Sequence, residues 1–157
     1  MKLLIFSDSH GELSNMRTAI ERERPDYIFH LGDHDRDAED LSREYPILPI
    51  TGVRGNCDYW TDTPVTRCVS LGGIRFFLCH GHTYGVKSSV LRASYAAREQ
   101  GADVLLYGHT HTPDYDKDPD SGLILLNPGA CGYGPSASYG RIIIQQGEMD
   151  IRLLKCK

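Results

Sequence analysis

Polar side chains follow the apolar segments of this chain at the points where those segments end. In the first half, three apolar runs cover Lys2–Phe6, residues 27–31 and residues 47–50, and they alternate with helical segments over residues 12–24 and 38–44. This strand–helix alternation predicts a parallel sheet covered by helices. Because open α/β sheets place their sites beyond the carboxyl ends of the strands, the residues after each run are candidates for a site.

The second half of the chain predicts further strands with a different connectivity. Residues 65–71 and Ile74–Cys79 are joined by two glycines and predict a β-hairpin. A helix is expected over residues 88–100 and a buried strand over residues 104–107. Short strands are expected over residues 123–126, 141–145 and 150–154. The expected architecture is one domain over residues 1–157 with two packed β-sheets flanked by α-helices, of class α/β, or α+β if the second sheet is mainly antiparallel.

Seven side chains of metal-ligating type lie at the ends of these strands. They comprise two carboxylates, one carboxamide and four imidazoles: Asp8, His10, Asp33, Asn56, His80, His109 and His111. Residues two apart in extended chain point the same way, so the pairs D-x-H and H-x-H each present two ligands to one place. The set is too large for one tetrahedral ion, and a carboxylate can bridge two ions.

The chemistry of the donors indicates which metals to expect. Mixed nitrogen and oxygen ligation without thiolate suits Mn, Fe, Zn, Co or Ni better than Mg or Ca, and we expect two divalent ions, with Mn²⁺ as the first choice. Two such ions, two aspartates and a bridging hydroxide leave about one positive charge to attract a phosphate.

The order of the motifs resembles that of the calcineurin-like metallophosphoesterases. D-x-H, GD, GN-x-D, H and GH-x-H succeed one another between residues 8 and 111. The segments SDSHG, GNCD and HGHTYG and the small size resemble the compact YfcE-type phosphodiesterase branch. The resemblance implies a four-layer sandwich in which two sheets lie between helices.

The resemblance also implies roles for individual residues. One metal would be held by Asp8, His10, Asp33 and His111. The other would be held by Asp33, Asn56, His80 and His109, with Asp33 as the bridge. Catalytic roles fall to Asp33, Asn56 and Asp58, and substrate contacts are expected from Arg54, Cys57 and His82. Many members of the family carry a histidine after the asparagine of the GN motif, where it can protonate the leaving group, whereas this chain has Cys57.

Neighbouring polar residues have simpler interpretations. His30 lies inside an expected strand and is expected to be a hydrogen-bonded core histidine. The acidic residues between positions 35 and 40 are expected to form a solvated helix face.

The expected function is a metal-dependent phosphoesterase, most simply a phosphodiesterase, in which a hydroxide bridging the two metals attacks phosphorus. A phosphomonoesterase acting through the same site is an alternative. A non-catalytic scaffold similar to the retromer's phosphoesterase-like subunit is another, but all seven ligand positions carry competent side chains, which favours an enzyme. A serine hydrolase is disfavoured because the chain has no GxSxG motif.

Composition restricts which classes of partner and which cellular compartment we expect for this protein. The net charge of −4 argues against general nucleic-acid binding, and the apolar runs are too short to cross a membrane. The five cysteines form no CxxC motif and suggest no disulfide framework, and no charged and apolar leader is apparent, so we expect a reducing cytoplasm. The expected partner is a phosphoester substrate of unidentified structure; a homo-oligomer is left open.

Overall fold

The computed structural model describes residues 1–157 and contains two five-stranded sheets. In spatial order, the first sheet consists of β10 (Glu148–Lys155), β9 (Ser138–Gln145), β1 (Lys2–Phe6), β2 (Tyr27–His30) and β3 (Ile50–Gly52). The second consists of β4 (Thr66–Leu71), β5 (Ile74–Cys79), β6 (Val104–Leu106), β8 (Ile124–Pro128) and β7 (Pro113–Lys117).

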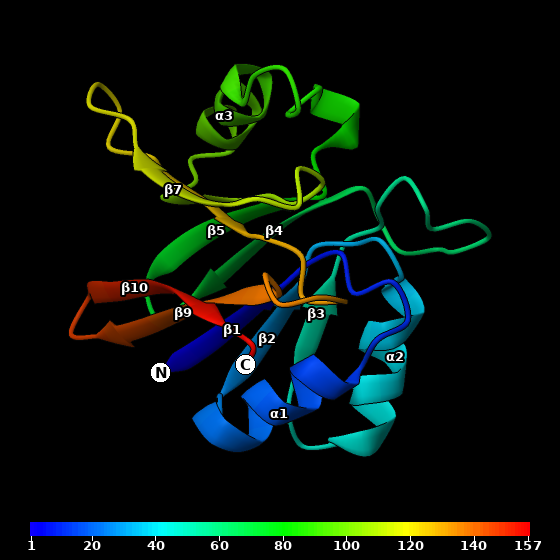
Figure 1. Ribbon diagram of the computed structural model, residues 1–157. Helices are drawn as coiled ribbons and strands as arrows, with labels where there is room; N and C mark the ends of the chain where they lie inside the picture. Colours follow the sequence, from blue (N-terminus) through cyan, green and yellow to red (C-terminus); the bar gives the residue numbers. More distant parts are fainter.

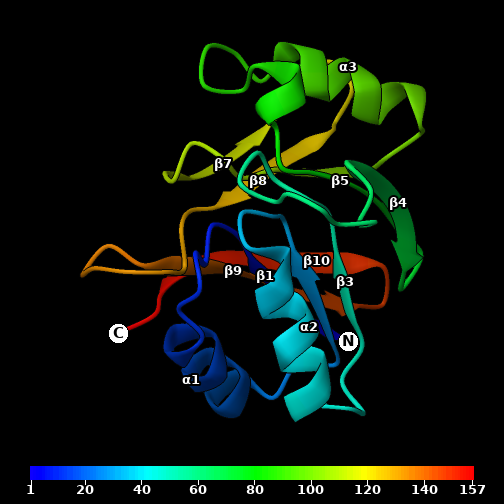
Figure 2. The same cartoon turned by 90° about the vertical axis from the view of Figure 1, so that its right-hand side faces the viewer.

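Helices cover the outer faces of both sheets. They are α1 (Ser14–Glu23), α2 (Asp35–Glu44) and α3 (Leu91–Glu99), with a short 3₁₀ helix, η1 (His82–Tyr84). Helices α1 and α2 lie side by side on the first sheet and α3 lies on the second, so the molecule has the four layers that the sequence predicted (Figures 1 and 2). The longest of these helices has ten residues, and none could span a lipid bilayer.

Each sheet contains both parallel and antiparallel strands. Strands β1, β2 and β3 pair in parallel, while β9 and β10 join them in antiparallel fashion. In the second sheet β5, β6 and β8 are parallel, and β4 and β7 are antiparallel edge strands. The loops that follow the parallel strands of each sheet therefore lie together, at the carboxyl ends of those strands.

The alternation of side chains along β1 explains how the layers pack. Leu3 and Ile5 point into the core between the two sheets, where they meet Phe76 of β5. Leu4 and Phe6 point the other way, into the core beneath α1. Because both faces of β1 are buried, the strand is apolar at nearly every position and needs no polar alternation.

Two expectations about strands were inaccurate. Strand β3 begins at Ile50 rather than spanning residues 47–50, because Pro49 lacks an N–H for the ladder, and Ile47 is 96% exposed. Strand β7 was not predicted at all. Its five residues are exposed and carry no apolar alternation, because it is an edge strand held by backbone pairing with β8.

Candidate metal centre

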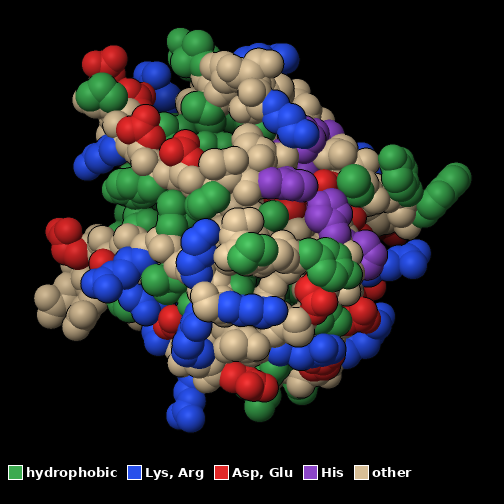
Figure 3. All heavy atoms as spheres, in the orientation of Figure 1, with side chains coloured by type: hydrophobic (Ala, Val, Ile, Leu, Met, Phe, Trp, Pro, Cys, Tyr) green, Lys and Arg blue, Asp and Glu red, His purple; other side chains and the backbone are tan.

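The predicted ligands lie together at the carboxyl ends of β1, β2, β5 and β6. Histidine side chains cluster on this part of the surface in Figure 3. One group of ligand atoms within 4.8 Å of one another comes from Asp8, His10, Asp33 and His111. A second such group comes from Asp33, His80 and His109. Asp33 belongs to both groups, which is the geometry that a bridging carboxylate requires.

The backbone at these positions is unusual. Five of the seven predicted ligands have φ angles between 49° and 69°: Asp8, His10, Asp33, His109 and His111. Left-handed backbone is uncommon in residues other than glycine, although Asp and His tolerate it better than most. Such residues concentrate where a site requires a particular side-chain direction. The sharp turns aim successive side chains of each loop toward one centre.

Two glycines allow the loops to approach one another closely. A Cβ atom at Gly55 would collide with the carboxylate of Asp33, and one at Gly108 would collide with the hydroxyl of Ser7. Any larger residue would therefore displace the loops that carry Asp33 and Asp8.

The carboxylate of Asp8 has one oxygen that the protein leaves without a hydrogen bond. Its Oδ2 atom accepts the hydroxyl of Ser7 at 2.6 Å and the backbone N–H of His109 at 3.2 Å. Its Oδ1 atom is buried and accepts none, although His111 Nε2 lies 3.1 Å away. An unpaired buried carboxylate oxygen is destabilising, and a metal ion at this position would satisfy it.

The imidazole of His80 is oriented by a backbone carbonyl. Its Nδ1–H donates to the carbonyl oxygen of Leu31 at 2.8 Å, which directs Nε2 into the site. There Nε2 lies 3.1 Å from Oδ1 of Asn56 and 3.3 Å from Oδ2 of Asp33. Asn56 therefore lies beside the second ligand group; its role as a metal ligand stays a prediction.

The electrostatics of the site favour the entry of positive charge. Burial alone would raise the pKa of Asp33, but hydrogen bonds from His80 and Cys57 outweigh it and hold that pKa well below its usual value. Burial would lower the pKa of His80, but the carboxylates of Asp33 and Asp8 outweigh it and raise that pKa. The two aspartates therefore attract a proton to His80 when no metal is bound, and a divalent ion can take its place. The donor set fits such an ion.

Asp58 serves the backbone of the site. Its Oδ1 atom accepts the N–H groups of His34 at 2.7 Å and Asp35 at 2.9 Å. Its Oδ2 atom accepts those of Asp33 at 3.0 Å and Gly55 at 2.6 Å. Four donors occupy this buried carboxylate, so the geometry describes a positioning residue; a direct catalytic role for Asp58 stays a prediction.

Asp37 joins two of the ligand loops. Its carboxylate accepts the backbone N–H of Gly11 at 2.8 Å and lies 2.7 Å from Nδ1 of His34. The expectation of a solvated acidic helix face was therefore wrong for the first turn of α2, where Asp35 and Asp37 are buried. The sequence gives no local signal for this role, because an acidic residue in a first helical turn is common for other reasons.

His30 connects the loop that follows β1 with the loop that follows β2. It is buried, and its Nδ1 atom accepts the N–H of Gly32 at 3.3 Å. Its Nε2–H is then free to donate to the hydroxyl of Ser9 at 2.9 Å. His30 is a hydrogen-bonded core histidine, as expected, but one that spans the loops carrying the two aspartate ligands.

Of the three residues expected to contact substrate, His82 and Cys57 lie against the candidate ligands. The ring of His82 lies 5.4 Å from that of His80, and burial lowers the pKa of His82. The positive charge of Arg54 contributes to the same lowering of the pKa of His82. The backbone N–H of Cys57 donates to Oδ1 of Asp33 at 2.9 Å, and burial, followed by the charge of Asp33, raises the pKa of its thiol.

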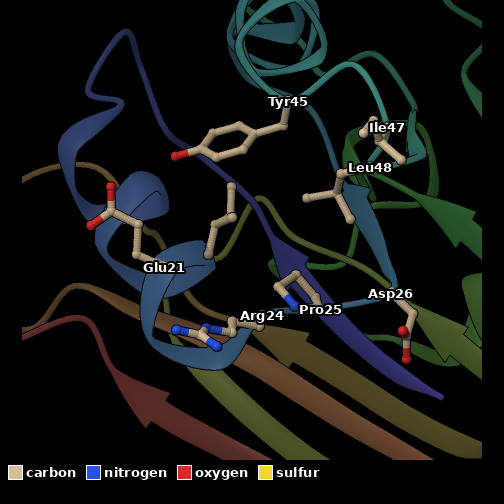
Figure 4. A pocket seen from close by; sticks show the side chains of 8 residues that line it. Glu21, Arg24, Pro25, Asp26, Tyr45, Ile47 and Leu48 are labelled. Atoms are coloured by element: carbon tan, nitrogen blue, oxygen red, sulfur yellow. The ribbon is translucent and has the colours of Figure 1, made fainter.

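A cavity of about 640 Å³ lies away from these residues. Figure 4 shows it between the end of α1 and the segment after α2. Its lining residues are Ile20, Glu21, Arg24, Pro25, Asp26, Tyr45, Ile47 and Leu48. Because Asp26 directly precedes β2, this cavity lies at the amino-terminal end of that strand, whereas the ligands follow its carboxyl end. It does not contribute to the candidate metal centre.

Comparison with known sequences identifies the family. The calcineurin-like phosphoesterase superfamily domain matches residues 1–147. The chain belongs to this superfamily. It is similar to the probable metallophosphoesterase YsnB of Bacillus subtilis, with 34% identity over 133 residues, covering 83% of this chain and 75% of the relative. It is also similar to phosphodiesterase YfcE of Escherichia coli, with 30% identity over 169 residues, covering 90% of this chain and 87% of the relative.

Solved structures agree with this assignment. A predicted phosphoesterase from Streptococcus pneumoniae superposes with a TM-score of 0.82 and 26% identity, over 99% of this chain and 89% of the other. Wild-type Vps29 of Entamoeba histolytica, solved in complex with zinc, superposes with a TM-score of 0.77 and 18% identity, over the full length of both chains. The second likeness shows a shared fold.

Proposed function

We propose that this metallophosphoesterase is a phosphodiesterase that uses two divalent metal ions, most simply Mn²⁺. The observation that carries the proposal is the position of Asp33, whose carboxylate belongs to both groups of converging ligand atoms. The buried Oδ1 atom of Asp8, which has no hydrogen-bond partner, supports it independently. The relative named as a phosphodiesterase favours diesters over monoesters.

In this proposal, two sets of residues would each bind one metal ion. One ion would lie at Asp8, His10, Asp33 and His111. The other would lie at Asp33, Asn56, His80 and His109. Two divalent ions would polarise the phosphoryl oxygens and lower the pKa of a water molecule until it can attack phosphorus.

The protein's own groups prepare this site before substrate arrives. Gly55 and Gly108 allow the loops to approach, and Asp58 fixes the backbone of Asp33. The ring of His82 lies beside that of His80, and we expect His82 and Arg54 to contact the substrate phosphate, the guanidinium as a charge-assisted donor. Preorganised groups of this kind stabilise the charge that develops in the transition state.

Two alternatives share this fold. A phosphomonoesterase would use the same ligands, and a scaffold would use the fold without chemistry, as the likeness to Vps29 allows. The complete ligand set and the unpaired oxygen of Asp8 favour an enzyme over a scaffold. We also propose that residues 1–157 form a single domain; a cytoplasmic location and a homo-oligomer stay predictions.

Metal content and activity test the proposal together. After chelation, the protein should lose hydrolysis of bis(4-nitrophenyl) phosphate, and Mn²⁺ should restore it. 4-Nitrophenyl phosphate, a monoester with the same leaving group, should be cleaved more slowly. Full activity in protein shown to contain no metal would end the two-metal proposal, and faster cleavage of the monoester would favour the phosphomonoesterase.

A further inference from the structure

Two aromatic side chains stand in solvent on the loop between β3 and β4. Trp60 is 100% exposed and Tyr59 is 73% exposed. This loop projects from the molecule in Figure 1, and hydrophobic side chains protrude at the same place in Figure 3, beside the histidines. Rings of this size gain free energy from burial, so their exposure is unfavourable in the absence of a partner.

The backbone holds these rings in place although they are exposed. Before them, Asp58 is fixed by the four backbone N–H groups that it accepts. After them, the hydroxyl of Thr61 donates to the carboxylate of Asp35. Trp60 itself has a φ of 59°, which is a strained conformation for a bulky side chain. The aromatic pair is therefore anchored on both sides to the segment that follows Asp33.

The rings line a cavity that lies beside Asp33, to which the lining residue Cys57 is hydrogen-bonded through its backbone N–H. Its volume is about 250 Å³, and Tyr59 and Trp60 share it with His34, Arg36 and Cys57. His34 directly follows the bridging aspartate, and Cys57 directly follows Asn56. A group attached to a phosphate at the ligands can thus extend along this cavity toward the rings.

We propose that Tyr59 and Trp60 form a stacking platform for a planar aromatic group on the retained ester arm of the substrate, the arm that is not the leaving group. The inference rests on the proposed phosphodiesterase function and names its substrate class, namely diesters that carry a nucleobase or another aryl group. An aromatic face binds any such ring by stacking, and Arg36 supplies the one positive charge of a cavity wall that also contains Asp35 and Asp58. Tyr59 and Trp60 are then specificity-determining residues, separate from the ligands that bind metal.

Fluorescence tests the platform without turnover, because Trp60 is the only tryptophan. The Mn²⁺-loaded protein would be titrated with AMP, phenyl phosphate and ribose 5-phosphate. AMP and phenyl phosphate should quench the emission, whereas ribose 5-phosphate should compete with AMP without quenching. Binding of AMP, measured separately by equilibrium dialysis, without any quenching would overturn the platform and leave the phosphate site standing. Failure of all three to bind would overturn both proposals.

Kinetics with matched leaving groups test the same inference in turnover. The 4-nitrophenyl ester of thymidine 5′-phosphate, 4-nitrophenyl phenyl phosphate and 4-nitrophenyl methyl phosphate release the same phenol and differ only in the other arm. Trp60→Ala should raise KM for the thymidine ester about tenfold more than KM for the methyl ester. Trp60→Phe should retain most of this preference. The phenyl ester shows whether any aryl arm suffices or a nucleobase is needed.

A surface aromatic residue elsewhere supplies the control. Tyr115 is 50% exposed on β7, outside the cavity, and Tyr115→Ala should leave all three KM values unchanged. An equal rise for the methyl and thymidine esters in Trp60→Ala would overturn the platform, since it would mean that the loop only supports the metal site. No change with any substrate would overturn it as well, and would instead favour a role for the rings in binding a protein.

Discussion

The carboxylate of Asp58 accepts the backbone N–H of Asp33 at 3.0 Å. The same buried carboxylate accepts three further N–H groups, so it fixes the loop that carries the proposed bridging ligand. An amide has only one acceptor oxygen, and Asp58→Asn would turn its NH₂ group toward backbone donors. We expect Asp58→Asn to lower the free energy of unfolding of the metal-free protein by about 2 kcal/mol and to weaken metal binding.

Urea denaturation and metal titration measure both effects. Asp62 lies on the same loop but is exposed, so Asp62→Asn removes the same charge without breaking these hydrogen bonds. Equal unfolding free energies for Asp58→Asn and Asp62→Asn would contradict the positioning role.

The shared position of Asp33 predicts how two substitutions differ in metal content. Asp33→Asn removes a negative charge from between two dications and should weaken both sites. His111 belongs to one ligand group only, so His111→Ala should weaken one site and leave the other near its original affinity. Equilibrium dialysis with Mn²⁺ measures the number of ions bound. Two full equivalents in Asp33→Asn, at unchanged affinity, would show that this carboxylate is not a bridge.

His30 makes the stability of the protein depend on pH. Burial lowers its pKa in the folded protein, whereas in the unfolded chain that pKa is about 6.5. Below about pH 6.5 the unfolded state therefore binds more protons than the folded state. As the pH is lowered, this group reduces the free energy of unfolding by up to about 1.4 kcal/mol per pH unit. Above that pH the histidine is neutral in both states and contributes no pH dependence.

His30→Gln isolates this contribution, because glutamine hydrogen-bonds without titrating in this range. Urea denaturation of both metal-free proteins between about pH 5 and 7 should show a smaller loss of stability in the variant. Contributions that the two proteins share cancel in the difference. Parallel curves for the two proteins would mean that the burial of His30 does not govern this part of the pH dependence.

The convergence of the candidate ligands could be predicted from the sequence because most of them lie in local motifs. Asp8 and His111 lie in two-residue motifs that directly follow apolar segments, and strand order then brings the segments together. The roles of Asp37 and His30 could not be predicted in this way. Each also has a partner on a loop more than twenty positions away along the chain, and only the tertiary arrangement of β1, β2 and α2 reveals that contact.

For the fold as well, elements with a local sequence pattern could be predicted and those that depend on tertiary contacts could not. The position of β1 was correct because burial on both faces imposes an apolar run. Strand β7 has no apolar run, because its exposed residues are held by backbone pairing with β8 and do not pack into a core. The positive φ angles at the ligands have no reliable sequence signal either, because Asp and His occur as readily in ordinary turns.

Cys57 predicts how strongly the rate depends on the leaving group. It stands where many calcineurin-like proteins have a histidine, and a thiol, with an ordinary pKa of about 8.5, is a poorer proton donor at neutral pH than an imidazolium. General acid catalysis typically contributes about 10²- to 10⁴-fold, and most where the leaving group is a poor one. Asp58 cannot replace it, because its oxygens are occupied by backbone donors. We therefore expect activated aryl diesters to be cleaved far faster than alkyl diesters.

Substitutions at Cys57 separate the thiol from the loop. Its contact with Asp33 uses the backbone N–H, so Cys57→Ala preserves it and should cost little with activated diesters. Cys57→His supplies a proton donor and should raise the rate for alkyl diesters specifically, flattening the dependence on leaving-group pKa. Rates for a series of aryl and alkyl diesters, measured with the wild type and both variants, test this. A flat profile in the wild type, or loss of activity toward activated diesters in Cys57→Ala, would show that the thiol itself takes part in the reaction.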